Sequence, residues 1–486
     1  MRLSGSDHSE RIAYIEQQVA PLVAEGEDTA GKPRSPLLAR MAEAGAAGIS
    51  VAVIEDGRIA WARGYGVVEA GKPELVTPET LFQCASISKP VAAVMALRLV
   101  EEGKLTLDGD VNDYLTSWKI PPITYWDKKG RVDKQPHITL RQLISHTAGL
   151  TVHGFPGYPV GAPLPSLTTI LNGESPANTP PIRVDTLPGV QMRYSGGGYT
   201  VLTQLLEDVT GKPFPTLAQE LVLAPLGMRD SGFEQPLSTE RARIAAKAHH
   251  VRDGKAQPIP GGWHIYPELA PDGLWATPSD LARFALGLRA ALAGEPQAIL
   301  SQATMRKMMT PQAPEENVDA VGLGVFLSGA GATARFGHTG GNEGFNCELT
   351  AYQQRGQGAV VMTNGDGGWL VLKALLNTIA EAYNWPDYTP FHLSGAWGAA
   401  DGGEPFTQFV GTYADDAGRR CAVTSDDGEL WLAFGNQPSL PSTPETATTY
   451  SVDGLNARVT FTLGDTGGAT ALILHQNGRD MPLTRR

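Results

Sequence analysis

The sequence predicts an α+β fold: an antiparallel sheet flanked by helices with an inserted helical subdomain, followed by a small C-terminal all-β domain. Strand-like patterns occur near both ends of the first part of the chain, at 48–66 and 321–367. The pattern between them is mainly helical, and short strand patterns alternate with turn signals at 406–486. Because strands at both ends flank a helical middle, the simplest assembly is one sheet built from both ends of the domain.

The length also predicts two domains, because 486 residues exceed the usual size of one. A stretch rich in Gly, Pro and Ala at 386–405 is typical of a boundary. The expected parts are a first domain at 1–395, with sheet segments near 40–85 and 320–390 and a helical segment near 86–320, and a second domain at 403–486.

Local signals predict the elements of the first domain. Residues 48–66 form a β-hairpin pattern that turns at Asp56-Gly57, a pair suited to a tight turn. A helix is expected at 88–103, ending at Gly103. The other expected helices share an apolar period near 3.6 residues and lie at 9–25, 139–146, 199–210, 215–223, 278–293, 301–309 and 368–385.

Two long stretches without a clear period, 116–137 and 152–190, interrupt the helical part. Long loops in compact domains often act as lids or binding walls, and a plain surface connection is an equally good interpretation of both stretches. The strand patterns of the C-terminal part predict a small barrel or a sandwich. His475 lies in one of them and is interpreted as structural, since a lone strand histidine seldom binds a ligand.

Composition limits the classes of partner. Hydrophobic residues make up 42% of the chain and charged residues 19%, as in an ordinary globular protein. The net charge of −12 argues against nucleic acid or an anionic membrane as a partner. No apolar run is long enough to span a bilayer, and the N-terminus has no apolar leader, so we expect a cytoplasmic protein unless a leader was removed, which would make it periplasmic.

The segment Ser86-Ile87-Ser88-Lys89 is the first candidate site. A serine and a lysine three residues apart lie on one helical face, where they can share a proton. A serine hydroxyl needs a neighbouring base, and a lysine can be that base if its pKa is lowered. The pattern is weak when it stands alone, because an N-capping Ser86 or Ser88 followed by a solvated lysine looks the same.

Two later segments strengthen this interpretation: Tyr194-Ser195-Gly196 and His338-Thr339-Gly340-Gly341. Together with Ser86-x-x-Lys89 they resemble the three ordered motifs of the serine β-lactamase and penicillin-binding-protein superfamily. The phrases LRQLISHTAGLT (140–151) and DGLWATPSDLARFALGL (272–288) fit the same family. The resemblance covers roughly 45–385. Within the superfamily, this chain is most similar to the class C-like group, which includes esterases and D-amino-acid peptidases.

The resemblance implies an active site in a cleft between sheet and helices. Ser86 would be the nucleophile, and Lys89 would be the base for acylation or the partner that keeps Tyr194 ionisable. A free lysine titrates near 10.4 and a tyrosine near 10, so both need help near neutrality, and their coupled titrations leave the proton unassigned. The remaining implied site residues are His338, the backbone N–H groups of Ser86 and Gly341 as the oxyanion hole, and Thr339 and Gly340 in substrate binding.

Two departures from the family pattern bear on the substrate. His338 occupies a position where many relatives have lysine, so a permanent cation suited to a carboxylate is replaced by a mostly neutral hydrogen-bonding group. Gly196 stands where the family has an asparagine that contacts a substrate amide. Both changes favour an esterase or a peptidase over a β-lactamase.

Other chemistries lack support in the sequence. Cys84, Cys347 and Cys421 are few and far apart, so they imply neither disulfides nor a metal cluster, and Cys84 is interpreted as a small buried residue. The motifs of metal hydrolases, nucleotide binders and α/β-hydrolases are missing from the sequence. His146 is assigned a structural role.

We therefore expect a serine hydrolase without cofactor or metal, acting through an acyl-enzyme on small esters or on amide and peptide bonds. Two alternatives stay open: a D-amino-acid peptidase or acyltransferase on the same site, and a non-catalytic receptor that senses acylation or binds peptides. The sequence leaves the oligomeric state and the physiological substrate open.

Overall fold

A computed structural model of the chain divides into two compact units. Unit 1 comprises Met1–Ile120, His137–Arg183 and Leu187–His392, and unit 2 comprises Pro121–Pro136, Val184–Thr186 and Leu393–Arg486. The structure describes residues 8–23, 32–127, 130–184, 188–189, 192–313, 320–392, 406, 408–415, 418–426, 429–435, 440–444, 448–452, 457–464, 468–476 and 479–486. The predicted boundary near 395–403 lies outside these residues and stays a prediction.

Unit 1 is built around a sheet that joins both ends of the domain. Among the described residues this sheet has seven antiparallel strands in the order β11-β12-β13-β14-β15-β1-β2. In chain order the strands are β1 (Gly48–Glu55), β2 (Arg58–Gly66), β11 (Ala320–Val321), β12 (Phe326–Ser328), β13 (Arg335–Asn342), β14 (Phe345–Tyr352) and β15 (Gly358–Thr363). Because β1 pairs with β15, the first strand of the domain lies beside its last, as predicted.

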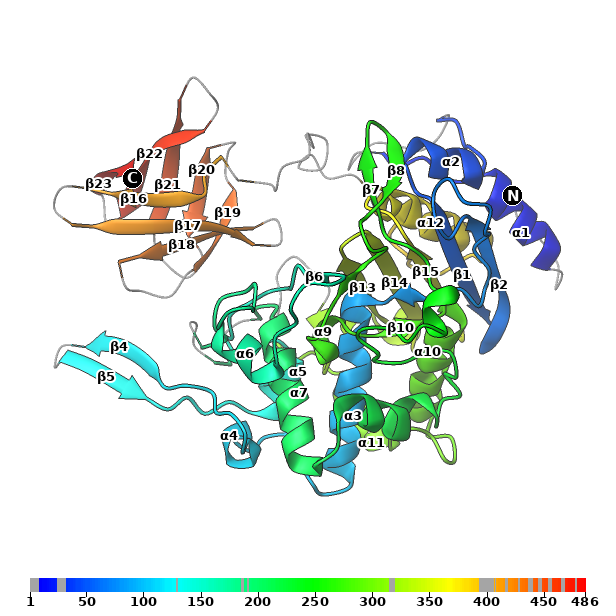
Figure 1. Ribbon diagram of the computed structural model, residues 1–486, viewed down its shortest axis with the longest axis horizontal. Coiled ribbons are helices and arrows are strands. Elements are labelled where there is room, and N and C mark those ends of the chain that lie inside the picture. Colours follow the sequence, from blue (N-terminus) through cyan, green and yellow to red (C-terminus); the bar gives the residue numbers. More distant parts are fainter. Residues whose placement is uncertain are drawn as a thin grey trace. The chain divides into compact units, whose positions relative to one another are not determined.

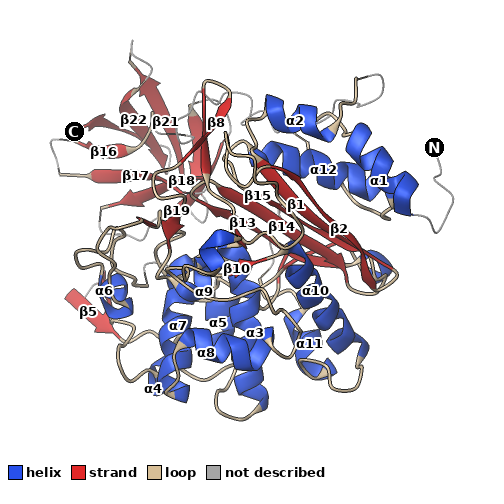
Figure 2. Ribbon diagram, turned by 45° about the vertical axis from the view of Figure 1, so that its right-hand side comes forward, coloured by secondary structure: helices blue, strands red, loops and turns tan. Residues whose placement is uncertain are grey.

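Helices cover both faces of this sheet (Figure 2). One face packs against α1 (His8–Gln17), α2 (Leu37–Glu43) and α12 (Gly368–Ala382) in a shared apolar core. The other face carries α10 (Pro278–Ala293), which contacts β1, β2 and β15. Successive side chains of β1 point to opposite faces of the sheet, and this alternation lets both faces pack against helices.

The helical segment lies between β2 and β11 in the chain, as predicted. It contains α3 (Ser88–Glu101), α4 (Val111–Tyr114), α5 (Leu140–Ile144), α6 (Leu167–Asn172), α7 (Gly196–Thr210), α8 (Phe214–Ala218), α9 (Leu269–Asp272) and α11 (Gln302–Met308). The α9 helix packs against both α3 and α7 (Figure 1). Among the described residues, no helix is both long enough and apolar enough to cross a bilayer.

The two stretches expected to be irregular contain regular elements. Within 116–137, β4 (Ile123–Asp127) and β5 (Gly130–Lys134) form a hairpin. Within 152–190 lies α6, which starts where the Ser166 side chain accepts a hydrogen bond from the N–H of Thr169. The surrounding prolines and glycines hide these short elements, because a sequence pattern needs several turns or alternations to stand out.

The predicted C-terminal all-β domain is a closed barrel, and eight strands of it are described. The strand patterns of the sequence missed two of these strands, β19 (Leu440–Pro444) and β23 (Arg479–Arg485), because the two prolines of β19 and the one proline of β23 weaken a strand pattern. The other strands are β16 (Gly411–Ala414), β17 (Arg420–Asp426), β18 (Glu429–Phe434), β20 (Thr449–Val452), β21 (Ala457–Leu463) and β22 (Ala469–Gln476). Apolar side chains including Phe409, Tyr413 and Phe461 fill its core.

Candidate active site

Ser86 lies in a short 3-10 turn, Ala85–Ile87, which leads directly into α3. The alternative interpretation, in which Ser86 or Ser88 only caps the helix, does not hold, because the position before α3 is Ile87 and makes no side-chain cap. The Ser88 hydroxyl instead donates to the carbonyl of Ala85 at 2.6 Å. Ala85 has a φ of +45°, an uncommon value for a residue with a side chain. This bond holds the strained turn that presents Ser86.

A second segment is tied to this turn by backbone bonds. The strand β10 (Trp275–Ala276) pairs with β3 (Phe82–Gln83), which leads into the turn. The Cys84 N–H donates to the carbonyl of Leu274 at 2.8 Å. The Leu274 N–H donates in turn to the Ser88 hydroxyl at 3.0 Å. These bonds place the C-terminal end of α9 beside Ser86.

Lys89 is buried in the first turn of α3, with its side chain 1% exposed. Its Nζ donates to Ser86 Oγ at 2.8 Å and to the carbonyl of Pro271 at 3.2 Å. Burial lowers the pKa of Lys89 from its ordinary value, and the nearby Asp272 carboxylate opposes this shift. The spacing of Ser86 and Lys89 thus brings the two groups into direct contact.

Asp272 is a third member of this cluster, and the sequence analysis missed it. Its Oδ1 accepts a hydrogen bond from Ser86 Oγ at 3.2 Å and lies 3.7 Å from Lys89 Nζ. Its side chain is 4% exposed, and burial raises its pKa, an effect that Lys89 opposes. The available signal was a lone acidic residue in the apolar phrase APDGLWA, read only as part of a family resemblance.

Tyr194 lies just before α7, and aromatic rings surround it. Its ring stacks on His146 with centroids 4.2 Å apart and lies 4.7 Å from the ring of His153. The ring of Phe326, on β12, lies 6.3 Å away in a nearly parallel orientation. Lys89 Nζ is 4.9 Å from the centre of the Tyr194 ring. The fold thus brings Tyr194 to the Ser86–Lys89 pair.

His146 is buried and stacks against the ring of Tyr194. Its Nδ1 accepts a hydrogen bond from the N–H of Ser195 at 3.1 Å. Burial and the charge of Lys89 hold the pKa of His146 well below its ordinary value, so the ring is neutral. The contacts fit the structural role assigned to His146, since it orients the residues at the start of α7.

Close backbone packing accounts for the glycine where the family has asparagine. A Cβ on Gly196 would lie 2.8 Å from the carbonyl oxygen of His153, and one on Gly197 would lie 2.3 Å from that of Thr151. Both distances are too short for a side chain without a shift of the backbone. The loop before residue 154 therefore occupies the space that an asparagine would need.

The strand β13 carries the remaining predicted residues. Its pairing with β12 stops at Gly337, and residues 338–342 pair with β14. A Cβ on Gly340 would lie 2.3 Å from the carbonyl of Cys84, so this strand edge closely approaches the turn of Ser86. Gly340 is buried, whereas Thr339 and Gly341 are exposed.

His338 is buried on β13, with 5% of the residue exposed. Its Nδ1 lies 2.5 Å from the carbonyl of Thr339, and a carbonyl only accepts, so Nδ1 carries the proton. Burial and the charge of Lys89 lower the pKa of His338 to about 3, which keeps the ring neutral. The ring thus donates through Nδ1, and its Nε2 is an acceptor.

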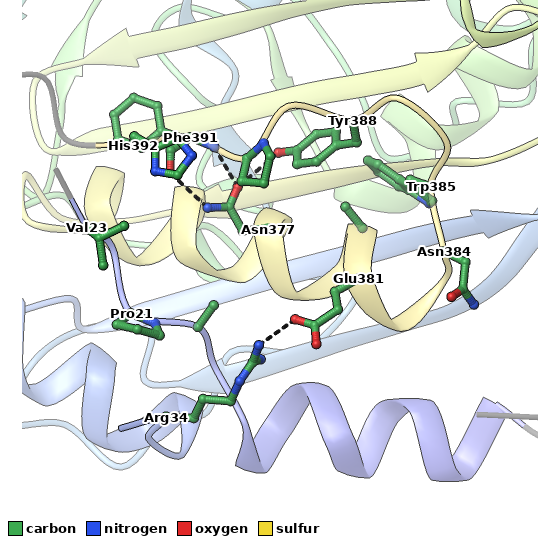
Figure 3. A pocket seen from close by; sticks show the side chains of 13 residues that line it. Pro21, Val23, Arg34, Asn377, Glu381, Asn384, Trp385, Tyr388, Phe391 and His392 are labelled. Carbon is green, nitrogen blue, oxygen red and sulfur yellow. Dashed lines mark hydrogen bonds and ion pairs between the residues drawn. The ribbon is translucent and has the colours of Figure 1, made fainter. Parts of the chain in front are cut away.

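Outside this cluster, the described residues form a cavity but no arrangement suited to a metal ion. In the described ranges, no group of three or more His, Cys, Asp or Glu side chains is arranged to hold a metal ion. A cavity of about 350 Å³ lies between the N-terminal segment and α12, and Figure 3 shows the Arg34–Glu381 ion pair at its wall. None of the predicted site residues lines this cavity.

Comparison with known proteins agrees with this arrangement. The sequence profile of the family described as beta-lactamase matches residues 36–381. The chain belongs to the β-lactamase family. The resemblance drawn from the motifs of the sequence is thereby confirmed.

Individual relatives and solved structures extend the comparison. Esterase EstB of Burkholderia gladioli is 32% identical over 237 residues, which are 45% of this chain and 56% of EstB. Penicillin-binding protein 4* of Bacillus subtilis is 22% identical over 465 residues, 90% of this chain and 94% of that protein. The octameric penicillin-binding protein homologue from Pyrococcus abyssi shares the fold, with a TM-score of 0.56 at 20% identity over 92% of this chain and 98% of the other. The chain spans 56–64% of the length of the first curated relatives it matches.

Proposed function

We propose that this protein is a serine hydrolase that forms an acyl-enzyme on Ser86 and acts on small esters. The observation that carries the proposal is the direct contact of 2.8 Å between Ser86 Oγ and the buried Nζ of Lys89. A lysine so placed lowers the energetic cost of negative charge on the serine oxygen. A free serine hydroxyl has no such neighbouring cation. The reaction needs no cofactor.

The surrounding groups have roles that follow from their positions. The backbone N–H groups of Ser86 and Gly341 are the proposed oxyanion hole. The support for this proposal is the close approach of β13 to the turn that carries Ser86. We assign Tyr194, whose ring centre is 4.9 Å from Lys89 Nζ, the role of donating a proton to the leaving group. Thr339 and Gly340 belong to the strand edge along which a substrate would lie.

An ester is favoured over a β-lactam or a peptide with a free carboxylate. His338 is neutral, and its donor is taken by the Thr339 carbonyl, so it offers a carboxylate neither a cation nor an N–H. The space of the amide-binding asparagine is filled by the loop against Gly196. The name of EstB, an esterase of the same family, supports the same substrate class.

One observation favours a second candidate, an amide-cleaving D-amino-acid peptidase or acyltransferase. An amine leaving group needs a proton, and Tyr194 beside the Lys89 ammonium is a suitable donor. Adding an acceptor amine or alcohol and analysing the products separates the candidates. Transfer product that outruns hydrolysis would replace the hydrolase proposal with a transferase.

The proposal is tested with p-nitrophenyl butyrate on the wild type and on Ser86→Ala, with intact-protein mass spectrometry of each. We expect turnover and a transient butyryl adduct on the wild type, and neither on the variant. Equal turnover in both proteins would remove Ser86 from the mechanism. A single stoichiometric acylation without turnover would indicate the receptor alternative.

A further inference from the structure

The Ser86 hydroxyl is held between two charged groups of opposite sign. Lys89 Nζ lies 2.8 Å from Ser86 Oγ and donates to it. The hydroxyl proton of Ser86 points the other way, to Oδ1 of Asp272 at 3.2 Å. An ammonium has three donors and no acceptor, so Lys89 in its charged form is unable to take the serine proton. The group on the accepting side of the hydroxyl is Asp272.

We propose that Asp272 is a further catalytic residue of this hydrolase, the general base that takes the proton of Ser86 during acylation. Lys89 then remains an ammonium and stabilises the oxygen as its negative charge grows. The inference rests on the proposed function and assigns the proton that the motif comparison leaves open between Lys89 and Tyr194.

The surroundings of Asp272 suit a base. Lys89 is the cation paired with it, and both side chains are at most 4% exposed. The titratable groups that act on it or respond to it are Ser86, Lys89, His153, Tyr266, Glu268 and Cys347. A buried carboxylate beside a single ammonium keeps its charge and loses much of its solvation, which makes it a stronger base than a carboxylate in water.

The position of Asp272 is built into the fold. The Cys84–Leu274 and Ser88–Leu274 bonds anchor the chain that follows it. The side chain of Asn342, at the end of β13, donates to the Asp272 carbonyl at 3.3 Å. Asp272 is thus held in place from two sides, by the residues that flank the turn of Ser86 and by β13.

In the proposed acylation step, Ser86 exchanges its proton for the acyl group of the ester. Ser86 Oγ forms a bond to the carbonyl carbon of the ester while its O–H bond breaks and the proton passes to Oδ1 of Asp272. The carbonyl electron pair moves to the oxygen in the oxyanion hole. When that pair returns, the bond to the leaving alcohol breaks and the alkoxide takes the hydroxyl proton of Tyr194. The proton that Asp272 took from Ser86 then restores the Tyr194 hydroxyl, so the site regains its starting charge.

The first test is made on the unmodified protein. The single-turnover rate of acylation by p-nitrophenyl butyrate is measured between pH 4 and 9. We expect the rate to fall on the acid side through one ionisation that lies above the ordinary aspartate value of about 3.9. An acylation rate that is constant down to pH 4, or that falls only through an ionisation near 10, would overturn the assignment.

The second test uses variants. Asp272→Asn keeps the shape of the side chain and removes the base, so acylation should slow by about 10²–10⁴-fold and lose the acid-side ionisation. Asp272→Ala should be slow as well and be partly restored by added formate, which a structural role would not produce. The control is Asp280→Asn, a buried carboxylate that accepts from Ser231 at 2.8 Å and should affect stability and leave the pH profile unchanged.

The outcomes separate the two proposals. Wild-type protein that forms no acyl adduct would overturn the proposed function and this inference with it. A wild type that acylates, together with Asp272→Asn acylating within about threefold and with the same pH profile, would overturn the inference alone.

Discussion

The Lys89 ammonium and the Asp272 carboxylate lie 3.7 Å apart at the base of the candidate site, and both contact the same hydroxyl, that of Ser86. Two charges with almost no solvent contact depend on each other, because either one alone would be buried without compensation. The pair therefore links the stability of unit 1 to the chemistry proposed for it.

This dependence predicts the effect of removing one partner. Lys89→Met should lower the free energy of unfolding by about 3–5 kcal/mol, because it leaves the Asp272 carboxylate buried and unpaired. The double variant Lys89→Met with Asp272→Asn should recover part of that loss. Thermal unfolding of the two variants and the wild type measures both effects, and a double variant less stable than Lys89→Met would contradict the pairing.

Tyr194→Phe is expected to fold normally and to turn over about 10²–10⁴-fold more slowly. The phenylalanine keeps the ring stacked on His146 and removes only the hydroxyl. Steady-state kinetics with circular dichroism check both statements. The control is Tyr114→Phe, a half-buried residue of α4 whose hydroxyl contacts Thr106 in a solvent-exposed hydrogen bond. Near-normal turnover in Tyr194→Phe would remove this hydroxyl from the mechanism.

His338→Lys should shift preference towards substrates with a free carboxylate. The introduced ammonium supplies the cation that the neutral His338 lacks. We expect the ratio of kcat/KM for a carboxylate-bearing ester to that for its neutral analogue to rise by about tenfold or more, as one good charge-assisted contact is worth about 1.5–3 kcal/mol. The matched control is His338→Gln, which should leave the ratio unchanged; an equal rise in both would rule out charge as the cause.

Glu268 should make the protein less stable as pH rises. It is fully buried, and burial raises its pKa from 4.5 to about 8. The folded state therefore binds a proton that the unfolded state releases between these values, and stability falls as pH increases from 4.5 to 8, by up to about 1.4 kcal/mol per unit. Melting temperatures of Glu268→Gln should lose this decline, whereas the exposed control Glu295→Gln should keep it. An unchanged slope in Glu268→Gln would contradict the burial argument.

Two neighbouring glycines of α7 should respond oppositely to alanine. Gly197→Ala puts a Cβ 2.3 Å from the Thr151 carbonyl and should destabilise the protein by about 1–3 kcal/mol. Gly198→Ala meets nothing closer than 3.6 Å and should be neutral or stabilising by up to about 1 kcal/mol, since alanine favours helices. Unfolding curves of the two variants test this directly, and equal losses would show that the Thr151 contact is unimportant.

Local signals were sufficient for much of the fold. The Asp56-Gly57 turn and the apolar period of 278–293 were read correctly because tight turns and helices depend on bonds between near neighbours. Elements without such a signature were missed: the 123–134 hairpin, α6, and the proline-bearing barrel strands.

The same division holds for the candidate site. The sequence by itself determined that Ser86 and Lys89 meet, since three residues across a helix start span one turn whatever surrounds them. Only the tertiary structure decided that Asp272 faces them, because its position depends on the pairing of β3 with β10 and on bonds between chain segments far apart. Contacts between near neighbours follow from backbone geometry, whereas distant contacts follow from how the sheet and helices assemble.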